Sequence, residues 1–372
     1  MIWKNFLYLP RLLKNLKTAV HYDLLMIIRP KHYLLFILGS ILSSYIFYVN
    51  RSWGNPIGRC IYLSTFTFLF WWCCWSLYFE LRDIWQFRWY GGLVNLMGIS
   101  VNSVSIPLKQ TDKDIKKGVH RDLYGEILHH PKTNPQSPIV IFIHGFSDDS
   151  TYIRHLLVPL ALSFDVLAYD NRGTAGSRRA GNKNQFSEIV KDLADVIDFA
   201  RTHSTLGQRP IHLVGISLGA VAAIRQGIDP QKTYIKKVIA IAGIANYLDV
   251  LPQSPVAFKK QWYLWLRYNF FGVPINPLPA INKEISPLLH LQHSREAYGN
   301  SVEFSRYLNR TLYLIHAKND PIVSVSHFNQ NRDSAQLTFS NWLLARSGGH
   351  NLVKYETILT AAIIAKLREK SD

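Results

Sequence analysis

The sequence predicts an α/β fold in which a doubly wound, mostly parallel sheet forms the larger part of the chain. Short Ile- and Val-rich runs recur after residue 121, amphipathic helical segments separate them, and two long uncharged runs precede them. Strands that are apolar on both faces are typical of a parallel sheet covered by helices on both sides. The predicted strands are Ser137–Gly145, Phe164–Gly173, Arg209–Ser217, Lys236–Gly243, Arg310–Asp320 and, as the last one, Ala335–Trp342.

The flanking segments give the domain organisation. Residues 121–372 form the predicted α/β domain, and Arg121–Pro131 is expected to add an antiparallel edge strand. Residues 81–120 are expected to be a linker with a possible first strand. The segment 245–309 has no obvious strand and contains the aromatic, proline-bounded stretch FKKQWYLWLRYNFFGVPINPLP. We expect this helical insertion to cap the carboxyl edge of the sheet, where such folds bind ligands.

Two apolar runs in residues 32–80 predict a transmembrane helical hairpin. His32–Val49 and Cys60–Phe79 carry no formal charge, and each reaches the ~18–20 residues that a bilayer-spanning helix needs. The stretch NRSWGNPIGR between them holds turn residues. The alternative is a pair of buried helices in a soluble protein.

Basic residues around the runs predict the orientation of the hairpin. Lysines and arginines concentrate in residues 1–31 and again after residue 81, whereas only Arg51 and Arg59 lie between the runs. The positive-inside rule places both ends, and hence the α/β domain, on the cytoplasmic side of the membrane. The basic, amphipathic segment 1–31 is expected either to lie along the membrane surface or to be a solvated helix.

The composition of the chain limits its partners. A formal net charge of +17 suits an anionic surface, but the chain has no nucleic-acid-binding motif, so a membrane rather than a nucleic acid is the expected partner. The three cysteines all precede residue 80, which argues against a disulfide framework. No Cys/His spacing indicates zinc, and we expect neither a metal nor a cofactor.

Ser217 lies in the stretch GISLG, where an apolar strand meets an alanine-rich helix. In a strand–Gly-x-Ser-x-Gly–helix turn, Gly215 and Gly219 leave room for a tight bend, and the serine projects at the helix N-terminus as a nucleophile. The alternative is a small residue that only fits the turn.

A serine nucleophile also needs donors for the oxyanion. We expect one donor to be the backbone N–H of Leu218. The second is the N–H of Phe146, in the loop after the predicted strand Ser137–Gly145. Gly145 would let the backbone approach the substrate, and His144 is expected to shape this loop rather than to act in catalysis.

The general base is expected late in the chain. His350 follows two glycines after the predicted last strand, and Asp320 follows the preceding strand, so the chain order is Ser217, Asp320, His350. The competing histidines are His316, expected inside a strand, and His327, expected on a helix. Asp148 and Asp149 are competing acids but fall in the loop after the strand that carries His144.

Five motifs in order resemble the α/β-hydrolase superfamily, in particular its monoglyceride-lipase-like and serine-aminopeptidase-like branch. They are FIHGF at Phe142–Phe146, YDNRGTAGS at Tyr169–Ser177, GISLG at Gly215–Gly219, NDPIV at Asn319–Val323 and GGH at Gly348–His350. The resemblance implies that Asp170 and Arg172 organise the oxyanion loop. The second motif has one residue more than many relatives, and the hairpin is not part of the common family pattern.

The resemblance implies hydrolysis through an acyl-enzyme on Ser217. Basic flanks, the predicted anchor and the aromatic cap favour a lipid or other acyl ester, such as a lysophospholipid or a monoacylglycerol. An acyltransferase using the same intermediate, a peptidase or amidase, and a membrane scaffold without activity are the alternatives. The spacing of His144 and Asp149 matches an acyltransferase motif of another fold, but the oxyanion loop already accounts for His144.

Overall fold

We describe the protein from a computed structural model. The described residues are 30–71, 74, 94–109, 121–146, 148–151, 153–181, 186–253, 279–299, 301–350, 352 and 355–369. The chain divides into two compact units, Met1–Gly92 and Leu93–Asp372. Apart from residues 30 and 31, the predicted basic segment 1–31 lies outside the described residues.

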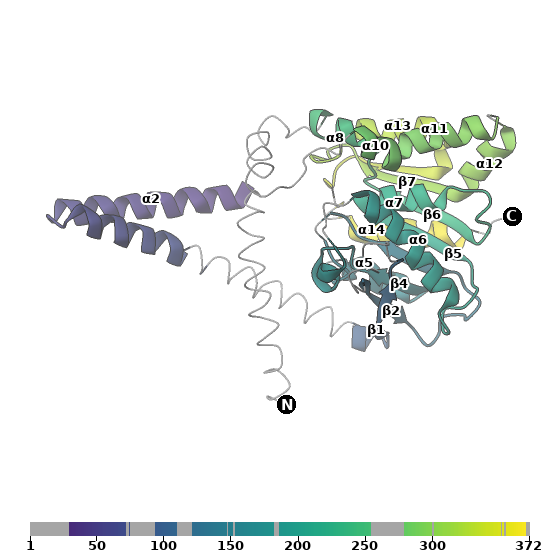
Figure 1. Ribbon diagram of the computed structural model, residues 1–372, viewed down its shortest axis with the longest axis horizontal. Coiled ribbons are helices and arrows are strands. Elements are labelled where there is room, and N and C mark those ends of the chain that lie inside the picture. The colour runs from purple at the N-terminus through teal and green to yellow at the C-terminus, as the bar shows by residue number, and fades with distance from the viewer. Residues whose placement is uncertain are drawn as a thin grey trace. The chain divides into compact units, whose positions relative to one another are not determined.

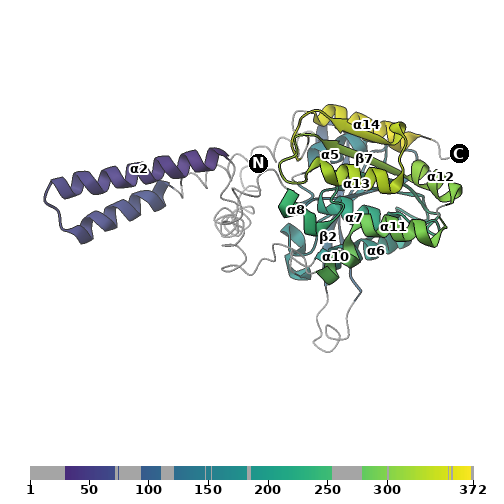
Figure 2. The same cartoon turned by 90° about the horizontal axis from the view of Figure 1, so that it is seen from above.

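The first unit contains two helices that lie side by side (Figures 1 and 2). Helix α2 spans Pro30–Ser52, and a turn at residues 53–56 leads to a second helix over residues 57–71. The hydroxyl of Ser43 donates to the carbonyl of Ser64 at 2.8 Å, and a Cβ atom on Gly39 would lie only 2.9 Å from the Trp71 ring. The small residues on α2 therefore let the two helices approach closely.

In the part of the chain that the structure describes, no helix has both the length and the apolar character of a membrane-crossing helix. The first predicted run lies within α2. The second continues past residue 71, where residue 74 is the next one described. The membrane-spanning role of the hairpin stays a prediction.

The second unit is built on an eight-stranded sheet with the order β1-β2-β4-β3-β5-β6-β7-β8. Strands β3 to β8 pair in parallel, whereas β2 pairs antiparallel with both β1 and β4. This confirms the predicted mostly parallel sheet. The strands are β1 Ser100–Pro107, β2 Asp122–His129, β3 Ile139–Ile143, β4 Asp165–Tyr169, β5 Ile211–Ile216, β6 Ile235–Ile241, β7 Leu312–Ala317 and β8 Trp342–Ala345.

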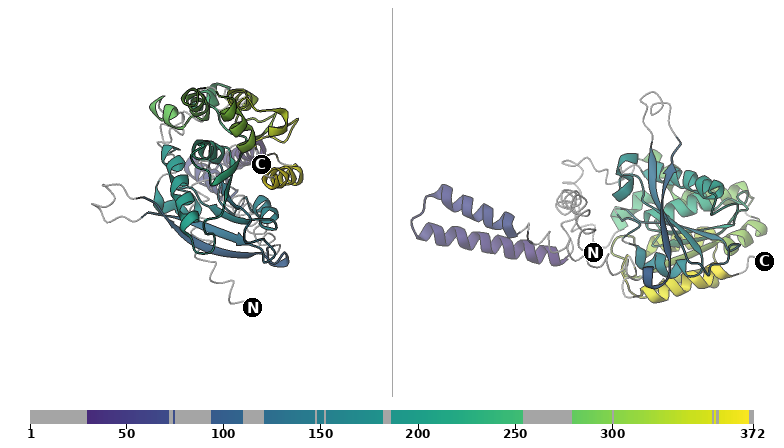
Figure 3. Two further views of the ribbon diagram at one scale, coloured as in Figure 1. Left: turned by 90° about the vertical axis from the view of Figure 1, so that its right-hand side faces the viewer. Right: turned by 90° about the horizontal axis from the view of Figure 1, so that it is seen from below.

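Helices cover both faces of the sheet, as the alternation within β3 requires (Figure 3). Ile141 belongs to a core shared with α6 (Phe186–Thr202), α7 (Leu218–Gly227) and α13 (Val325–Ala335). Phe142, one residue on, belongs to a second core with α5 (Arg154–Ala161) and α14 (Glu356–Arg368). Because every β3 residue is buried, the run had to be apolar on both faces.

Two predicted strand positions are wrong. The edge strand is β1, and β2, predicted as the edge, lies between β1 and β4 (Figure 3, right). The last strand covers Trp342–Ala345 rather than Ala335–Trp342, because α13 continues to Ala335 and Gln336 ends it in a left-handed conformation. The structure thus begins β8 at the residue where the prediction ended it.

The predicted cap segment contains four described helices: α8 Tyr247–Gln253, α10 Pro279–Ile285, α11 Pro287–Ala297 and α12 Val302–Thr311. Helix α12 packs against β6 and β7 and is thus part of the helical layer over the sheet. Helix α10 contacts α6, α7 and α8. Residues 254–278, with the aromatic stretch, lie outside the described residues.

Candidate active site

Ser217 lies at the junction of β5 and α7, at the carboxyl edge of the parallel strands. Its backbone has φ 55° and ψ −113°, which non-glycine residues rarely adopt, and its N–H donates to the carbonyl of Ile241 at 2.8 Å. The residue is 8% exposed. A strained serine held in this way at a helix N-terminus is the geometry of a nucleophile elbow.

The two glycines around Ser217 are required by close backbone approach. A Cβ atom on Gly215 would lie 2.2 Å from the carbonyl oxygen of Gly219, and one on Gly219 would lie 2.2 Å from that of Ile143. Both distances are far below van der Waals contact. The tight turn that the motif predicted is therefore present.

The predicted oxyanion donors lie on both sides of Ser217. Leu218 is the first residue of α7, so its N–H has no acceptor within the helix. Phe146 follows β3, which pairs in parallel with β5. The loop that carries Phe146 passes close to the serine, since a Cβ atom on Gly145 would lie 3.4 Å from the Ser217 Cβ.

Asp320 and His350 are brought together from separate loops of the same sheet edge. Asp320 follows β7 and His350 follows β8, and the imidazole Nδ1 lies 2.8 Å from Asp320 Oδ2. Since a carboxylate only accepts, Nδ1 carries the proton, which leaves Nε2 with a free lone pair. The N–H of Gly349 donates to the side chain of Asn319 at 2.9 Å and ties the two loops together.

The carboxylate of Asp320 is fully held. Its Oδ1 accepts the backbone N–H groups of Ile322 at 2.8 Å and Val323 at 2.9 Å. Burial alone would raise the pKa of Asp320, but the hydrogen bond and charge of His350, together with these N–H groups, lower it below the usual value. Asp320 is therefore ionised at neutral pH and can orient the imidazole.

Ser217 and His350 are not joined by a hydrogen bond in the described part of the chain: the acceptor of the His350 Nδ1 is Asp320, and Ser217 bonds through its backbone. The side chain of His350 is 14% exposed. Catalytic hydrogen bonds are often long in unliganded enzymes and tighten when substrate binds.

His144 is a structural residue of the loop after β3. Its buried ring donates from Nδ1 to the carbonyl of Gly145 at 2.7 Å, and its Nε2 accepts the N–H of Asn171 at 2.8 Å. Burial lowers the pKa of His144, which keeps the ring neutral as this pattern requires. The Asn171 side chain also donates to the His144 carbonyl at 3.1 Å. Sequence reasoning missed Asn171, although it stands inside the Tyr169–Ser177 motif.

Asp170 joins the segment after β4 to the segment that begins at Ser150. Its Oδ1 accepts the N–H of Ser150 at 2.8 Å, in the segment after the oxyanion loop, and its Oδ2 accepts the N–H of Gly176 at 2.8 Å. Burial raises the pKa of Asp170 to about 6, despite these two hydrogen bonds.

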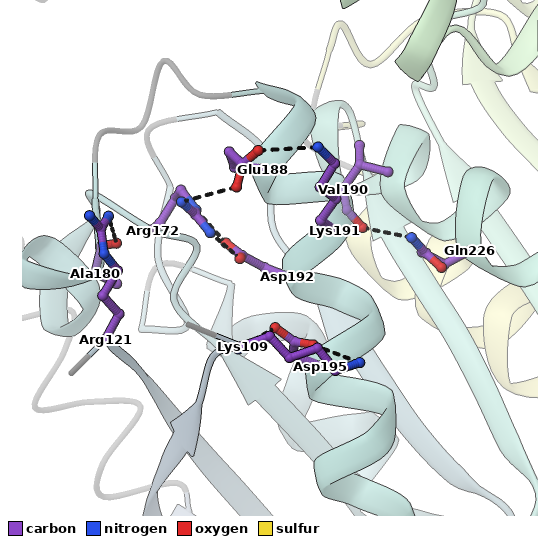
Figure 4. Close-up of polar contacts among 10 residues, drawn as sticks. All are labelled: Lys109, Arg121, Arg172, Ala180, Glu188, Val190, Lys191, Asp192, Asp195 and Gln226. Atoms are coloured by element: carbon purple, nitrogen blue, oxygen red, sulfur yellow. Dashed lines mark hydrogen bonds and ion pairs between the residues drawn. The ribbon is translucent and has the colours of Figure 1, made fainter. Parts of the chain in front are cut away.

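Arg172 differs from the expectation, because its partners lie on α6 and not in the oxyanion loop. Its Nε donates to Asp192 at 2.6 Å, a second guanidinium nitrogen bonds the same carboxylate, and Glu188 lies 3.8 Å away (Figure 4). Arg172 thus fixes the segment after β4 to α6. No pattern in the sequence distinguishes Asp192 from the other acidic residues of α6.

The two competing histidines are buried, one in β7 and one in α13. His316 lies in β7, donates from Nε2 to the carbonyl of Val323 at 3.0 Å and lies 3.8 Å from Asp320 Oδ2. His327 lies in α13, and burial lowers its pKa to about 4. Within the described residues, no three His, Cys, Asp or Glu side chains are grouped to hold a metal ion.

Residues 134–308 match the family described as serine aminopeptidase, S33, a range that includes Phe146 and Ser217 but ends before Asp320. No curated protein matches the chain. Among solved structures, an acylaminoacyl peptidase from Pyrococcus horikoshii has 16% identity and a TM-score of 0.50, with 76% of this chain and 44% of that chain covered.

Two further structures are similar. A putative dipeptidyl aminopeptidase IV from Bacteroides ovatus has 13% identity and a TM-score of 0.50, with 73% of this chain and 36% of that chain covered. An esterase from Pyrococcus furiosus has 16% identity and a TM-score of 0.49, with 74% and 95% covered. The chain thus spans less than half of either peptidase. With the serine elbow, the Asp320–His350 pair and the family match, the chain has the α/β-hydrolase fold.

Proposed function

We propose that the chain hydrolyses a carboxylic ester, with a lipid acyl ester as substrate, through an acyl-enzyme on Ser217. The observation that carries the proposal is the strained Ser217 at the elbow, on the same sheet edge as the 2.8 Å pair of Asp320 and His350. The roles of these residues are part of the proposal.

In the first half-reaction the Ser217 oxygen attacks the ester carbonyl carbon while His350 Nε2 accepts the hydroxyl proton. The N–H groups of Leu218 and Phe146 stabilise the oxyanion of the tetrahedral intermediate. The carbon–oxygen bond to the alcohol then breaks, and the proton passes from His350 to the leaving alcohol. Asp320 stabilises the charged imidazole throughout.

In the second half-reaction water takes the place of the alcohol. His350 removes a proton from water as its oxygen attacks the acyl carbon, and the same N–H groups hold the oxyanion. The bond to the Ser217 oxygen breaks, Ser217 recovers its proton from His350, and the carboxylic acid leaves.

Labelling with a fluorophosphonate probe tests the nucleophile. We expect the full-length protein to be labelled and the Ser217→Ala variant to show no labelling, while Ser340→Ala, a change of an exposed serine, is labelled like the wild type. Equal labelling of wild type and Ser217→Ala would remove Ser217 from the proposed role.

Peptide hydrolysis is a second candidate because the family match is described as a serine aminopeptidase. The two activities differ in the leaving group, so matched ester and amide substrates with one acyl group separate them. A higher kcat/KM for the ester, relative to the uncatalysed rate of each substrate, supports the proposal. The reverse order would make the chain a peptidase or amidase.

We also propose that the helical pair of the first unit attaches the enzyme to a membrane, with the α/β domain on the cytoplasmic side. Large apolar side chains are exposed on both helices, among them Ile41, Tyr45, Phe66 and Phe70, which are between 57% and 63% exposed. Exposed apolar surface of this extent indicates a lipid or protein partner.

Flotation of the full-length protein with phosphatidylcholine–phosphatidylserine vesicles tests the attachment. We expect the wild type to float and the double variant Ile41→Asn, Phe66→Asn to remain in the dense fraction. If both proteins stay in the dense fraction, the membrane proposal is wrong, whereas the proposed ester hydrolysis can still hold.

A further inference from the structure

We propose that Phe146, Phe186 and Tyr247 form an aromatic wall beside Ser217 that selects esters of bulky, uncharged apolar acids over acetate. This inference rests on the proposed ester hydrolysis and specifies the acyl group of its substrate.

The three rings form a continuous row although they come from three separate segments. The rings of Phe146, after β3, and Phe186, at the start of α6, meet edge to face with centroids 5.8 Å apart. Phe186 then stacks on Tyr247, the first residue of α8, at 5.6 Å with 24° between the ring planes. Both geometries are favourable for aromatic pairs, so the three rings position one another.

The row begins next to the nucleophile. Phe146 follows Gly145, whose Cβ atom would lie 3.4 Å from the Ser217 Cβ. The Phe146 N–H is the proposed donor to the oxyanion. The carbonyl carbon of the acyl group is bonded to that oxygen, so it lies next to the residue that carries the Phe146 ring. The wall is therefore placed to contact the acyl group rather than a distant part of the substrate.

Part of the apolar surface of the wall is not buried in the core. Phe146 and Phe186 are only partly buried and lie at the margin of the core, whereas Tyr247 is 6% exposed and anchors the far end. Contact with these ring faces stabilises a long acyl chain or an aryl acyl group. The acetyl group is too small to bury much apolar surface there and gains little binding energy. An anionic acyl group would lose hydration against these ring faces without gaining an ion pair from them.

Hydrolysis of p-nitrophenyl acetate and p-nitrophenyl octanoate tests the wall in the full-length protein. We expect the wild type to prefer octanoate in kcat/KM. Phe186→Ala should reduce the octanoate-to-acetate ratio about 10-fold or more, because removing apolar contacts acts on the long acyl chain. Phe199→Ala is the matched control, since Phe199 is on the same helix and its ring faces His203 at 5.1 Å.

The outcomes separate the inference from the proposed function. An unchanged ratio in Phe186→Ala, or a wild type without a preference for octanoate, overturns the wall while leaving ester hydrolysis in place. Ester cleavage that persists in Ser217→Ala overturns the proposed function instead. If Phe186→Ala does not fold, as judged by thermal unfolding, Phe186→Val decides: it removes the ring and most of its apolar surface, and a ratio equal to that of the wild type argues against the wall.

Discussion

At the scale of single residues, the site depends on groups held in conformations that local sequence specifies. Ser217 has φ 55° because the backbone of β5 must turn sharply into α7, and the Gly-x-Ser-x-Gly pattern was sufficient to predict that turn. The hydrogen bonds by which Asn171 holds His144 could not be predicted in the same way. They join the loops after β3 and β4 through side chain–backbone contacts at 2.8 and 3.1 Å, which leave no periodic trace in the sequence.

The pair of Asp320 and His350 carries a prediction at this scale. Asp320→Asn should lower kcat by a factor of about 10³–10⁴, because an amide can donate to Nδ1 and so favours the wrong imidazole tautomer. The 2.8 Å contact between the two residues makes this effect direct. Steady-state kinetics on a p-nitrophenyl ester measure it.

Asp333→Asn is a suitable control, because that side chain is 64% exposed and forms its ion pair with the neighbouring Arg332. Activity in Asp320→Asn within about threefold of the wild type, in a folded protein, would show that Asp320 does not orient the base.

At the scale of elements, the strands with apolar residues on both faces were predicted nearly in place. The outer strands were less well defined: β1 was only a possible strand within residues 81–120, and β8 was placed too early. β3, β4, β5 and β7 lie inside the predicted runs, and β6 begins one residue before its run, at Ile235, since each strand is buried between two helical layers. β1 reads SVNSVSIP, and most of its residues are exposed, so its sequence resembles a polar linker. The prediction placed the last strand too early because Leu337 and Phe339 suggest a strand. In the structure, the end of α13 and a short 3-10 helix lie in that stretch, before β8.

The close approach of α7 to the end of β3 gives a second prediction. Gly219→Ala should lower the free energy of unfolding by several kcal/mol, because its Cβ atom would lie 2.2 Å from the carbonyl oxygen of Ile143 and backbone has to move. Gly299→Ala should cost only about 1–2 kcal/mol, because its φ of 63° is unfavourable for alanine but, among the described residues, the added Cβ meets no atom of another segment within 4 Å. Urea unfolding of both variants measures the difference, and equal losses would contradict the assigned crowding.

The ion pair of Arg172 and Asp192, which attaches the segment after β4 to α6, gives a third prediction. Asp192→Asn should cost about 3–5 kcal/mol, because the guanidinium of Arg172, 6% exposed, would lose its buried carboxylate partner. Glu284→Gln breaks the neighbouring 3.0 Å pair with Lys191, whose side chain is 59% exposed, and should cost less than about 1 kcal/mol. A loss in Asp192→Asn as small as that in Glu284→Gln, measured by urea unfolding, would show that the Arg172 pair is not required.

At the scale of the whole molecule, buried histidines determine how the protein responds to acid. Burial, together with the charge of Lys237, lowers the pKa of His212 to about 3, and burial lowers that of His327 to about 4. Burial lowers the pKa of His144 and His316 as well. Above about pH 6.5 these rings are neutral in the folded and unfolded chain and do not affect stability.

Below that pH these histidines bind protons in the unfolded chain but stay neutral in the folded chain. The free energy of unfolding therefore falls as the pH falls. At about pH 5 the loss for His212 and for His327 is about 2 kcal/mol each relative to neutral pH. The raised pKa of Asp170, about 6, acts in the opposite sense, since the folded state gains a proton there first. The histidines outnumber it, and the net charge of +17 adds repulsion that grows as carboxylates are protonated.

We therefore expect the free energy of unfolding to fall between neutral pH and about pH 5, and the protein to unfold on the acid side of neutral. His327→Leu should move the acid midpoint to lower pH, because the variant removes a buried group that the unfolded state protonates, and both ring nitrogens of His327 lack hydrogen-bond partners within the described residues. His293→Leu, the same change at an exposed position, should leave the midpoint in place. Circular dichroism across a pH titration measures both. An equal midpoint in the two variants would mean that burial does not hold the pKa of His327 below that of the unfolded chain, and would contradict this account of the acid response.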